Sequence, residues 1–259
     1  MIISHTEVQL KRALDPAKGN VQTFLDRLLV EVVSDNYRYF LTECLAASKG
    51  GEETLEAHCW PPLLSNERQV FGLFAIGLSR VSPISIPEHP ISREHKSSDD
   101  TEPELKNKNG RIDFLAYHGT RHVALELKRY PISIIGNVTS KAGLTDQWNS
   151  VKKQSKEALA HMRKIKVKYE SPVSIGLLVI RVGRKVTSKV ELETARQKAN
   201  ESLPLIVESV EKLTKADYIS YYRAPKEMQI SYGWGKNEDE YSVFPGVIFA
   251  AVVHGNVSR

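Results

Sequence analysis

Asp113, Glu126 and Lys128 are the residues whose types and spacing best suit hydrolytic chemistry. They lie in two segments, 111–117 and 121–130, in which polar and apolar residues alternate as they do in β-strands. Two carboxylates and a lysine held close together can bind a divalent cation and act on a phosphodiester. These side chains can act together only if the two segments pair with each other.

A tight hairpin would pair the two segments in a definite register. Gly119 and Thr120 stand between them and predict a two-residue turn of type II′, because glycine comes first. Counting back from this turn places Asp113 directly opposite Glu126, with Lys128 one step along on the same face. The other face then collects only apolar side chains, which should fix the register by burial: Ile112, Phe114, Ala116, Val123, Leu125 and Leu127.

Two carboxylates opposite each other in a hairpin need a cation nearby. Directly opposed residues have Cβ atoms about 4.5–5.5 Å apart, and like charges at that separation are destabilising. Mg²⁺ suits the pair, because it binds through one or two carboxylates and keeps several waters, and Mn²⁺ should substitute for it. The alternative is a cross-strand lattice of salt bridges without metal, in which Arg111 and Lys128 balance Asp113 and Glu126.

At these residues the sequence resembles the PD-(D/E)xK nuclease superfamily, whose fold is restriction-endonuclease-like. The matching residues are Ile112-Asp113 on one strand and Glu126-Leu127-Lys128 on the next, with Ile112 in place of the usual proline. The resemblance implies that Asp113, Glu126 and the carbonyl of Leu127 would ligate Mg²⁺. It also implies that Lys128 would help to position the attacking water.

Two further positions follow from the resemblance alone. A glutamate on the first core helix is a metal ligand in many members, and Glu67 stands in the matching place. The alternative is that Glu67 only favours the dipole of its helix. A glutamine early in the second core helix lies beside the site in several subfamilies, and Gln147 matches it, with Gln154 as the alternative. Either glutamine could instead simply face solvent.

The expected fold class is α/β, with a restriction-endonuclease-like core of helix, β-meander, helix and strand over residues 63–182. The core elements would be a helix from Asn66, strands near 82–86, 110–117 and 121–130, a helix from Thr145 and a strand at 173–181. Residues 1–62 are predicted to form an N-terminal helical elaboration, with helices at 6–14 and 21–47. Residues 183–259 would add a C-terminal helix and strands, near 189–213, 218–223 and 247–254. Residues 87–110 are polar and predict a long loop.

Composition limits the class of protein. The chain has 259 residues, 41% of them hydrophobic, which is enough for a sizeable core, and a net charge of +5, which permits a polyanionic partner. No apolar run approaches about 18 residues, no signal peptide stands at residues 1–7, and Cys44 and Cys59 form no metal-binding pair. We therefore expect a cytoplasmic protein without a membrane partner. A lysine- and arginine-rich segment after the hairpin, residues 152–168, would suit DNA or simply form a solvated helix face.

The resulting hypothesis is a Mg²⁺-dependent deoxyribonuclease, an endonuclease of restriction, defence or repair. The alternatives are a catalytically silent nucleic-acid-binding or scaffolding module on the same fold, or a nuclease acting on RNA or branched DNA. Many members of the superfamily act as dimers, so the resemblance allows a homodimer. The remaining candidates are better explained by packing or surface exposure, namely His118, His122, Tyr221, Tyr222 and Trp234.

Overall fold

A single mixed β-sheet forms the centre of the protein. The computed structural model describes residues 7–15, 19–49, 61–64, 67–93, 108–134, 141–164, 172–186, 188–232 and 241–255. The strands of the sheet lie in the order β1-β6-β8-β5-β4-β3-β2, and β7 pairs with β8 off this path. β4 and β5 are parallel, whereas the other neighbouring strands are antiparallel.

The described residues form both β-strands and helices, with the following bounds. The strands are β1 (Val8–Arg12), β2 (Ser85–Arg93), β3 (Lys108–His118), β4 (Arg121–Ser133), β5 (Val173–Val186), β6 (Tyr218–Arg223), β7 (Ile230–Tyr232) and β8 (Tyr241–His254). The α-helices are α1 (Gly19–Lys49), α2 (Glu67–Val81), α3 (Lys141–Lys164) and α4 (Leu192–Thr214), and short 3₁₀ turns are η3 (Pro62–Leu64), η4 (Lys189–Glu191) and η5 (Lys226–Met228). Within the described ranges, no helix combines the length and apolarity needed to cross a membrane.

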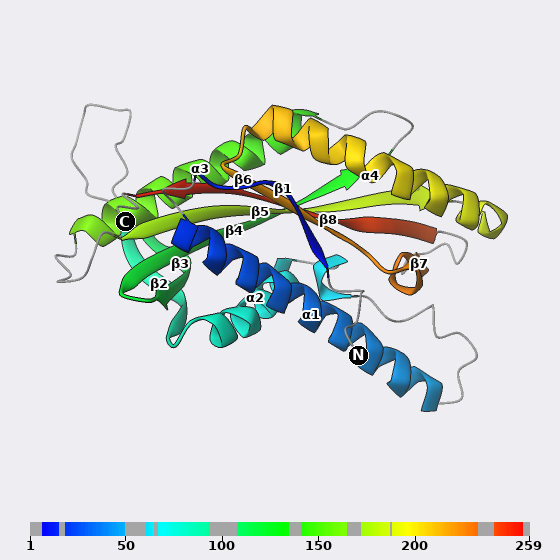
Figure 1. Ribbon diagram of the computed structural model, residues 1–259, viewed down its shortest axis with the longest axis horizontal. Helices are drawn as coiled ribbons and strands as arrows, with labels where there is room; N and C mark the ends of the chain where they lie inside the picture. The colour runs from blue at the N-terminus through cyan, green and yellow to red at the C-terminus, as the bar shows by residue number, and fades with distance from the viewer. Residues whose placement is uncertain are drawn as a thin grey trace.

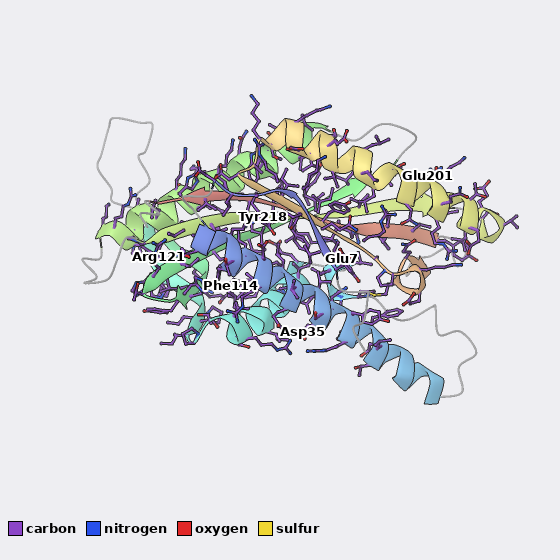
Figure 2. All side chains as sticks on the ribbon, viewed as in Figure 1. Glu7, Asp35, Phe114, Arg121, Glu201 and Tyr218 are labelled. Atoms are coloured by element: carbon purple, nitrogen blue, oxygen red, sulfur yellow. The ribbon has the colours of Figure 1, made fainter. Side chains whose placement is uncertain are left out.

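Helices cover both faces of the sheet. α1 and α2 lie on one face and α3 and α4 on the other (Figure 1). Figure 2 shows side chains filling the space between the layers, with Phe114 and Tyr218 on the α1 and α2 side. There Phe114 stacks on Phe71 of α2, with ring centroids 4.2 Å apart, and the Tyr218 hydroxyl donates a hydrogen bond of 2.8 Å to Asp26 of α1. The sheet therefore has a buried layer on each side.

The sequence predicted much of this order. The helix at 21–47 is confirmed as α1, and its apolar stripe is buried. The predicted succession of helix, three-stranded meander, helix and strand is present as α2, β2-β3-β4, α3 and β5. The strand at 173–181 is confirmed as part of β5, and both of its faces are covered. The helix cap predicted at Asn66 falls outside the described residues.

Several predicted elements were wrong in type or length. Residues 6–14 were expected to be helical, but Val8–Arg12 form β1, because this segment pairs with β6 at the sheet edge. The strand predicted at 82–86 begins later and continues to Arg93, so part of the expected loop at 87–110 is strand. α3 begins at Lys141, four residues before the expected Thr145. β8 begins at Tyr241, six residues before the expected start, where it gains partners in β5 and β7.

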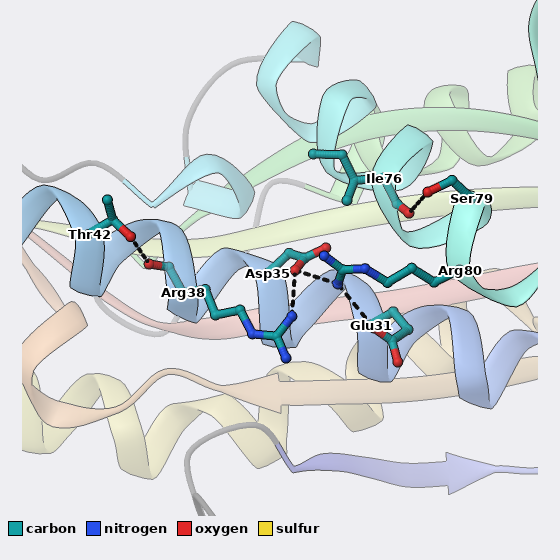
Figure 3. Close-up of polar contacts among 7 residues, drawn as sticks. All are labelled: Glu31, Asp35, Arg38, Thr42, Ile76, Ser79 and Arg80. Carbon is teal, nitrogen blue, oxygen red and sulfur yellow. Dashed lines mark hydrogen bonds and ion pairs between the residues drawn. The ribbon is translucent and has the colours of Figure 1, made fainter.

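An ion-pair network joins the two helices on one face (Figure 3). Asp35 of α1 accepts hydrogen bonds from Arg80 of α2 at 2.5 Å and from Arg38 at 3.3 Å, and Arg80 also reaches Glu31 at 3.1 Å. The Asp35 side chain is only 9% exposed, whereas that of Arg38 is 66% exposed. The carboxylates hold the pKa of Arg80 above its usual value through hydrogen bonds from Asp35 and then Glu31. This network fixes α2 against α1.

Replacing Arg80 should therefore destabilise the protein more than replacing Arg38. Arg80→Ala leaves a buried carboxylate with one weaker partner, which should lower the free energy of unfolding by about 1–3 kcal/mol. Arg38→Ala removes an exposed pair, worth less than about 1 kcal/mol. Urea denaturation of both variants measures the difference, and equal losses would contradict the role given to Arg80.

Candidate active site

The hairpin forms in the predicted register as far as the structure pairs it. His118 lies opposite Arg121, and the pairing continues to Phe114 opposite Leu125. Gly119 has a φ of 61°, and Thr120 is not among the residues with positive φ, as a type II′ turn requires. The φ values agree with the predicted turn type, and the register is confirmed from the turn to Phe114.

Beyond Phe114 the two strands part, and the Asp113 side chain bridges them. Asp113 Oδ2 accepts a hydrogen bond of 2.7 Å from the backbone N–H of Leu127. On the other side of β3, the pairing with β2 skips Asp113 and Glu88, and Glu88 has a φ of 51°. Because Leu127 N is bonded to the Glu126 carbonyl carbon, this contact brings the Asp113 carboxylate beside Glu126. The contact places the Asp113 carboxylate at the β4 backbone between Glu126 and Leu127. That the carboxylates of Asp113 and Glu126 face each other remains a prediction.

The irregularity at Asp113 corrects one part of the prediction. All six apolar residues of the hairpin are buried, and five lie on the α1 and α2 side. Ile112, however, packs on the opposite side with Leu115, Ala124 and Leu159 of α3. The strand loses its regular alternation between Ile112 and Phe114, where Glu88 interrupts the edge pairing. The expectation that all six share one face was therefore wrong for Ile112.

Glu126 is buried on the face that α3 covers, where a glycine lets α3 approach the sheet closely. Its side chain is 1% exposed, and it pairs in register with Gly176 of β5. A Cβ at Gly176 would lie 2.7 Å from Val151 Cγ1 and 2.9 Å from Ser155 Oγ, so α3 packs directly on this point of the sheet. Lys128, two residues on, shares this face and is half-buried. Arg111, expected beside Lys128, instead binds Glu88 at 2.7 Å.

Two glutamines of α3 lie within one helical turn of this point. Gln147 is four residues before Val151 and Gln154 is three residues after it, so both neighbour Val151 on the helix surface. Both are half-buried. The Gln154 Oε1 atom is buried and accepts no hydrogen bond within the described part of the chain. Gln154 therefore has a buried acceptor that could serve a ligand, and the roles of Gln147 and Gln154 remain predictions.

Glu67 lies on the other side of the sheet. Leu127 and Arg129 alternate with Glu126 and Lys128 along β4, and Leu127 belongs to the layer under α1 and α2. Glu67, in the first turn of α2, interacts electrostatically with Arg129. The structure therefore places Glu67 near the positive charge of Arg129, on the other side of the sheet from Glu126. The role of Glu67 as a metal ligand remains a prediction.

Arg129 belongs to a pair of half-buried arginines that sequence reasoning missed. Burial, and then the charge of Arg129, lowers the pKa of Arg181 to about 10. Arg181 donates to the Leu64 carbonyl at 2.6 Å, and its guanidinium carbon lies 5.0 Å from the Phe244 ring centroid. Burial also lowers the pKa of Arg129, whereas Glu67 opposes that shift. In the sequence, each of these arginines stands on a strand face whose neighbouring residues are apolar, and this pattern could have identified the pair.

The candidate metal-ligand set is small. Across the described ranges, no group of three or more His, Cys, Asp or Glu side chains is placed to hold a metal ion. The predicted set of Asp113, Glu126 and the Leu127 carbonyl contains two such side chains and one backbone oxygen. A site built on these residues would complete its coordination with water, as Mg²⁺ sites commonly do.

The other candidates have packing or surface roles. His118 lies 5.2 Å from the Phe24 ring and His122 lies 4.2 Å from the Tyr117 ring, both near the hairpin turn, and burial lowers the pKa of each histidine. Tyr222 is 1% exposed, and Tyr221 packs against the core beneath α4. Trp234 falls outside the described residues. The packing interpretation is confirmed for Tyr221 and Tyr222, whereas His122, interpreted from the sequence as a surface residue, is buried.

The basic segment after the hairpin is largely the outer surface of α3. Its exposed cations are Lys153, Lys156, Arg163 and Lys164, while Lys152 lies 6.0 Å from the Trp148 ring centroid. Residues 166 and 168 fall outside the described ranges. The charges therefore lie on the helix that covers Glu126.

Gly176 should tolerate no side chain. Gly176→Ala would push Val151 and Ser155 away from β5, which should lower the free energy of unfolding by about 1–3 kcal/mol. Gly72→Ala in α2 is the matched control, because a Cβ there meets nothing within 4 Å. Gly72→Ala should raise stability by up to about 1 kcal/mol through helix propensity. Urea denaturation tests both, and an unaffected Gly176→Ala variant would contradict this packing of α3.

The chain was compared with protein-family models, with curated proteins and with solved structures. No family model, no curated protein and no solved structure matches it.

Proposed function

We propose that the protein is a Mg²⁺-dependent nuclease that hydrolyses DNA phosphodiester bonds, as an endonuclease of restriction, defence or repair. The observation that carries the proposal is the contact between Asp113 Oδ2 and Leu127 N at the point where β3 and β4 part. It holds the Asp113 carboxylate against β4 at the residue that follows Glu126, which supports a site built from Asp113, Glu126 and Lys128. The order α2, β2-β3-β4, α3, β5 supports the same proposal, because it agrees with the restriction-endonuclease-like core that the sequence resemblance implies.

The residues present fit a hard divalent cation. Asp113 and Glu126 supply carboxylate oxygens, and the Leu127 carbonyl supplies a third, which is the donor set that Mg²⁺ or Mn²⁺ prefers. Glu126 is almost fully buried, and a buried carboxylate is stable as an anion only when a cation or hydrogen bonds compensate it. Bound Mg²⁺ would supply charge neutralisation on the phosphate and a more acidic water. Glu67 is left out of this set because it lies with Arg129.

The protein side chains have separate roles in this proposal. The Leu127 N–H holds one oxygen of Asp113, which fixes the direction of that carboxylate. Lys128 shares the face of Glu126 and supplies a positive charge for the phosphate in the transition state, while helping to orient the attacking water. Gln154 offers a buried amide oxygen that can accept a hydrogen bond from that water. The charges on α3 suit a polyanionic substrate.

Replacing Asp113 or Lys128 should abolish cleavage without unfolding the protein. The wild-type protein should nick supercoiled plasmid DNA with Mg²⁺ or Mn²⁺ and be inactive in EDTA. Asp113→Asn keeps an acceptor for Leu127 N but removes the charge, and Lys128→Met removes the cation. Each should lower the cleavage rate by about 100-fold or more, as expected for groups that stabilise transition-state charge.

Asp217→Asn provides a matched control for Asp113→Asn. Asp217 Oδ2 accepts a hydrogen bond of 2.9 Å from Val253 N, so it makes the same kind of side-chain-to-strand contact elsewhere in the fold. The control should cut DNA at the wild-type rate. DNA binding without cleavage under either metal would favour the silent binding module. Cleavage of RNA or branched DNA alone would favour the other alternative.

Metal binding should depend on Glu126 and not on Glu67. Glu126→Gln removes a proposed ligand and should weaken Mn²⁺ binding more than about tenfold, in line with the loss of one interaction of about 1.4 kcal/mol. Glu67→Gln should change it less than about twofold, because Glu67 faces Arg129 on the other side of the sheet. Isothermal titration calorimetry measures both. A loss with Glu67→Gln as large as that with Glu126→Gln would restore Glu67 to the ligand set.

A further inference from the structure

A basic cavity lies between the end of β5 and the beginning of α4. Its volume is about 470 Å³, within the range of small-ligand sites. Arg184 and Lys185 line it from β5, Lys198 and Thr194 line it from α4, and Glu191 lies at the junction. Three cations therefore surround one carboxylate and one hydroxyl.

Two of the three cations that line this cavity, Arg184 and Lys198, are available for a ligand, whereas Lys185 has an interaction of its own. Neither Arg184 nor Lys198 forms an ion pair within the described part of the chain. Along α4, Glu193 pairs with Arg196, Glu208 with Lys11 and Glu211 with Arg12, whereas Glu201 accepts a hydrogen bond from the neutral amide of Gln197 and keeps its charge. Like charges around one cavity repel each other, so an anion bound between them would be favourable. α4 also begins here without a side-chain cap, and its dipole adds to the positive potential.

The cavity lies on the same side of the sheet as Glu126 and Lys128. Val186 at its edge belongs to the layer beneath α3 and α4, which is the face of Gly176 and Glu126. Arg184 follows Gly176 by eight positions on one strand, which corresponds to about 26 Å. In B-DNA, with about 3.4 Å between base pairs, this is the length of roughly eight base pairs. In Figure 1, β5 runs from beneath α3 to the first turn of α4.

We propose that this cavity binds a backbone phosphate of nucleic acid and anchors the strand about eight base pairs from Asp113 and Glu126. The proposal rests on the proposed nuclease function for the identity of the polyanion. Arg184 and Lys198 contact the phosphate oxygens, and the Thr194 hydroxyl is placed to donate a hydrogen bond. Such contacts position the duplex and carry no sequence information.

The test measures binding without cleavage. The full chain is titrated into a fluorescent 20-base-pair duplex in EDTA, at several salt concentrations, and anisotropy is recorded. Arg184→Ala and Lys198→Ala should each weaken binding about fivefold and reduce the slope of log affinity against log salt by about 1. Lys212→Ala is the matched control, because it removes one exposed lysine from the same helix, fourteen positions or about 21 Å away. It should change affinity less than about twofold, and thermal unfolding should show all three variants folded.

Each alternative result overturns a different proposal. Equal effects of Lys198→Ala and Lys212→Ala would show general electrostatic attraction and overturn the cavity site. Binding of a mononucleotide that depends on Arg184, with unchanged duplex binding, would also overturn it in favour of a small phosphate ligand. Cavity-dependent duplex binding without metal-dependent cleavage would leave the site intact and overturn the nuclease. Metal-dependent cleavage, together with duplex binding that the cavity variants leave unchanged, would support the nuclease and overturn the cavity site.

Discussion

The parallel pairing of β4 with β5 at the centre of the sheet determines where every other part of the molecule lies. From Val173 to Ile180, β5 is buried on both faces, so each side chain there meets either the α1 and α2 layer or the α3 and α4 layer. Because β4 pairs in register with β5, its side chains are divided in the same way. Leu127 lies in the α1 and α2 layer, and Glu126 lies on the α3 and α4 side. Gly176 then decides how closely α3 can approach Glu126.

The opening between β3 and β4 follows from the edge of the same sheet. β3 is held between β4 and the edge strand β2, and its regular pairing is interrupted on both sides at Asp113. An interrupted ladder leaves backbone N–H groups that need other acceptors. The Asp113 carboxylate takes that role for Leu127, and the bond makes the irregularity stable. The same irregularity turns Ile112 toward α3, where it packs with Leu159.

The predictable parts of the structure were those fixed by neighbours in sequence. The turn at Gly119 and the alternation around it are local, and they gave the correct register of the hairpin. Residues 6–14 look equally compatible with a helix, since the partner that makes Val8–Arg12 a strand lies at Tyr218–Arg223. The extent of β2 likewise depends on its pairing with β3, which local propensity does not contain.

The same distinction explains why the candidate site was only partly predictable. Asp113 and Glu126 follow from a local turn, whereas the place of Glu67 depends on which face of the sheet α2 covers. α2 covers its face of the sheet through long-range packing on α1 and through the interaction of Glu67 with Arg129. These two residues are 62 positions apart in sequence. Arg129 neighbours Lys128 in sequence but lies across the sheet from it, so β4 presents one cation to each layer. Because a strand sends its successive side chains to opposite faces, Lys128 shares the face of Glu126 while Arg129 interacts with Glu67 on the other face.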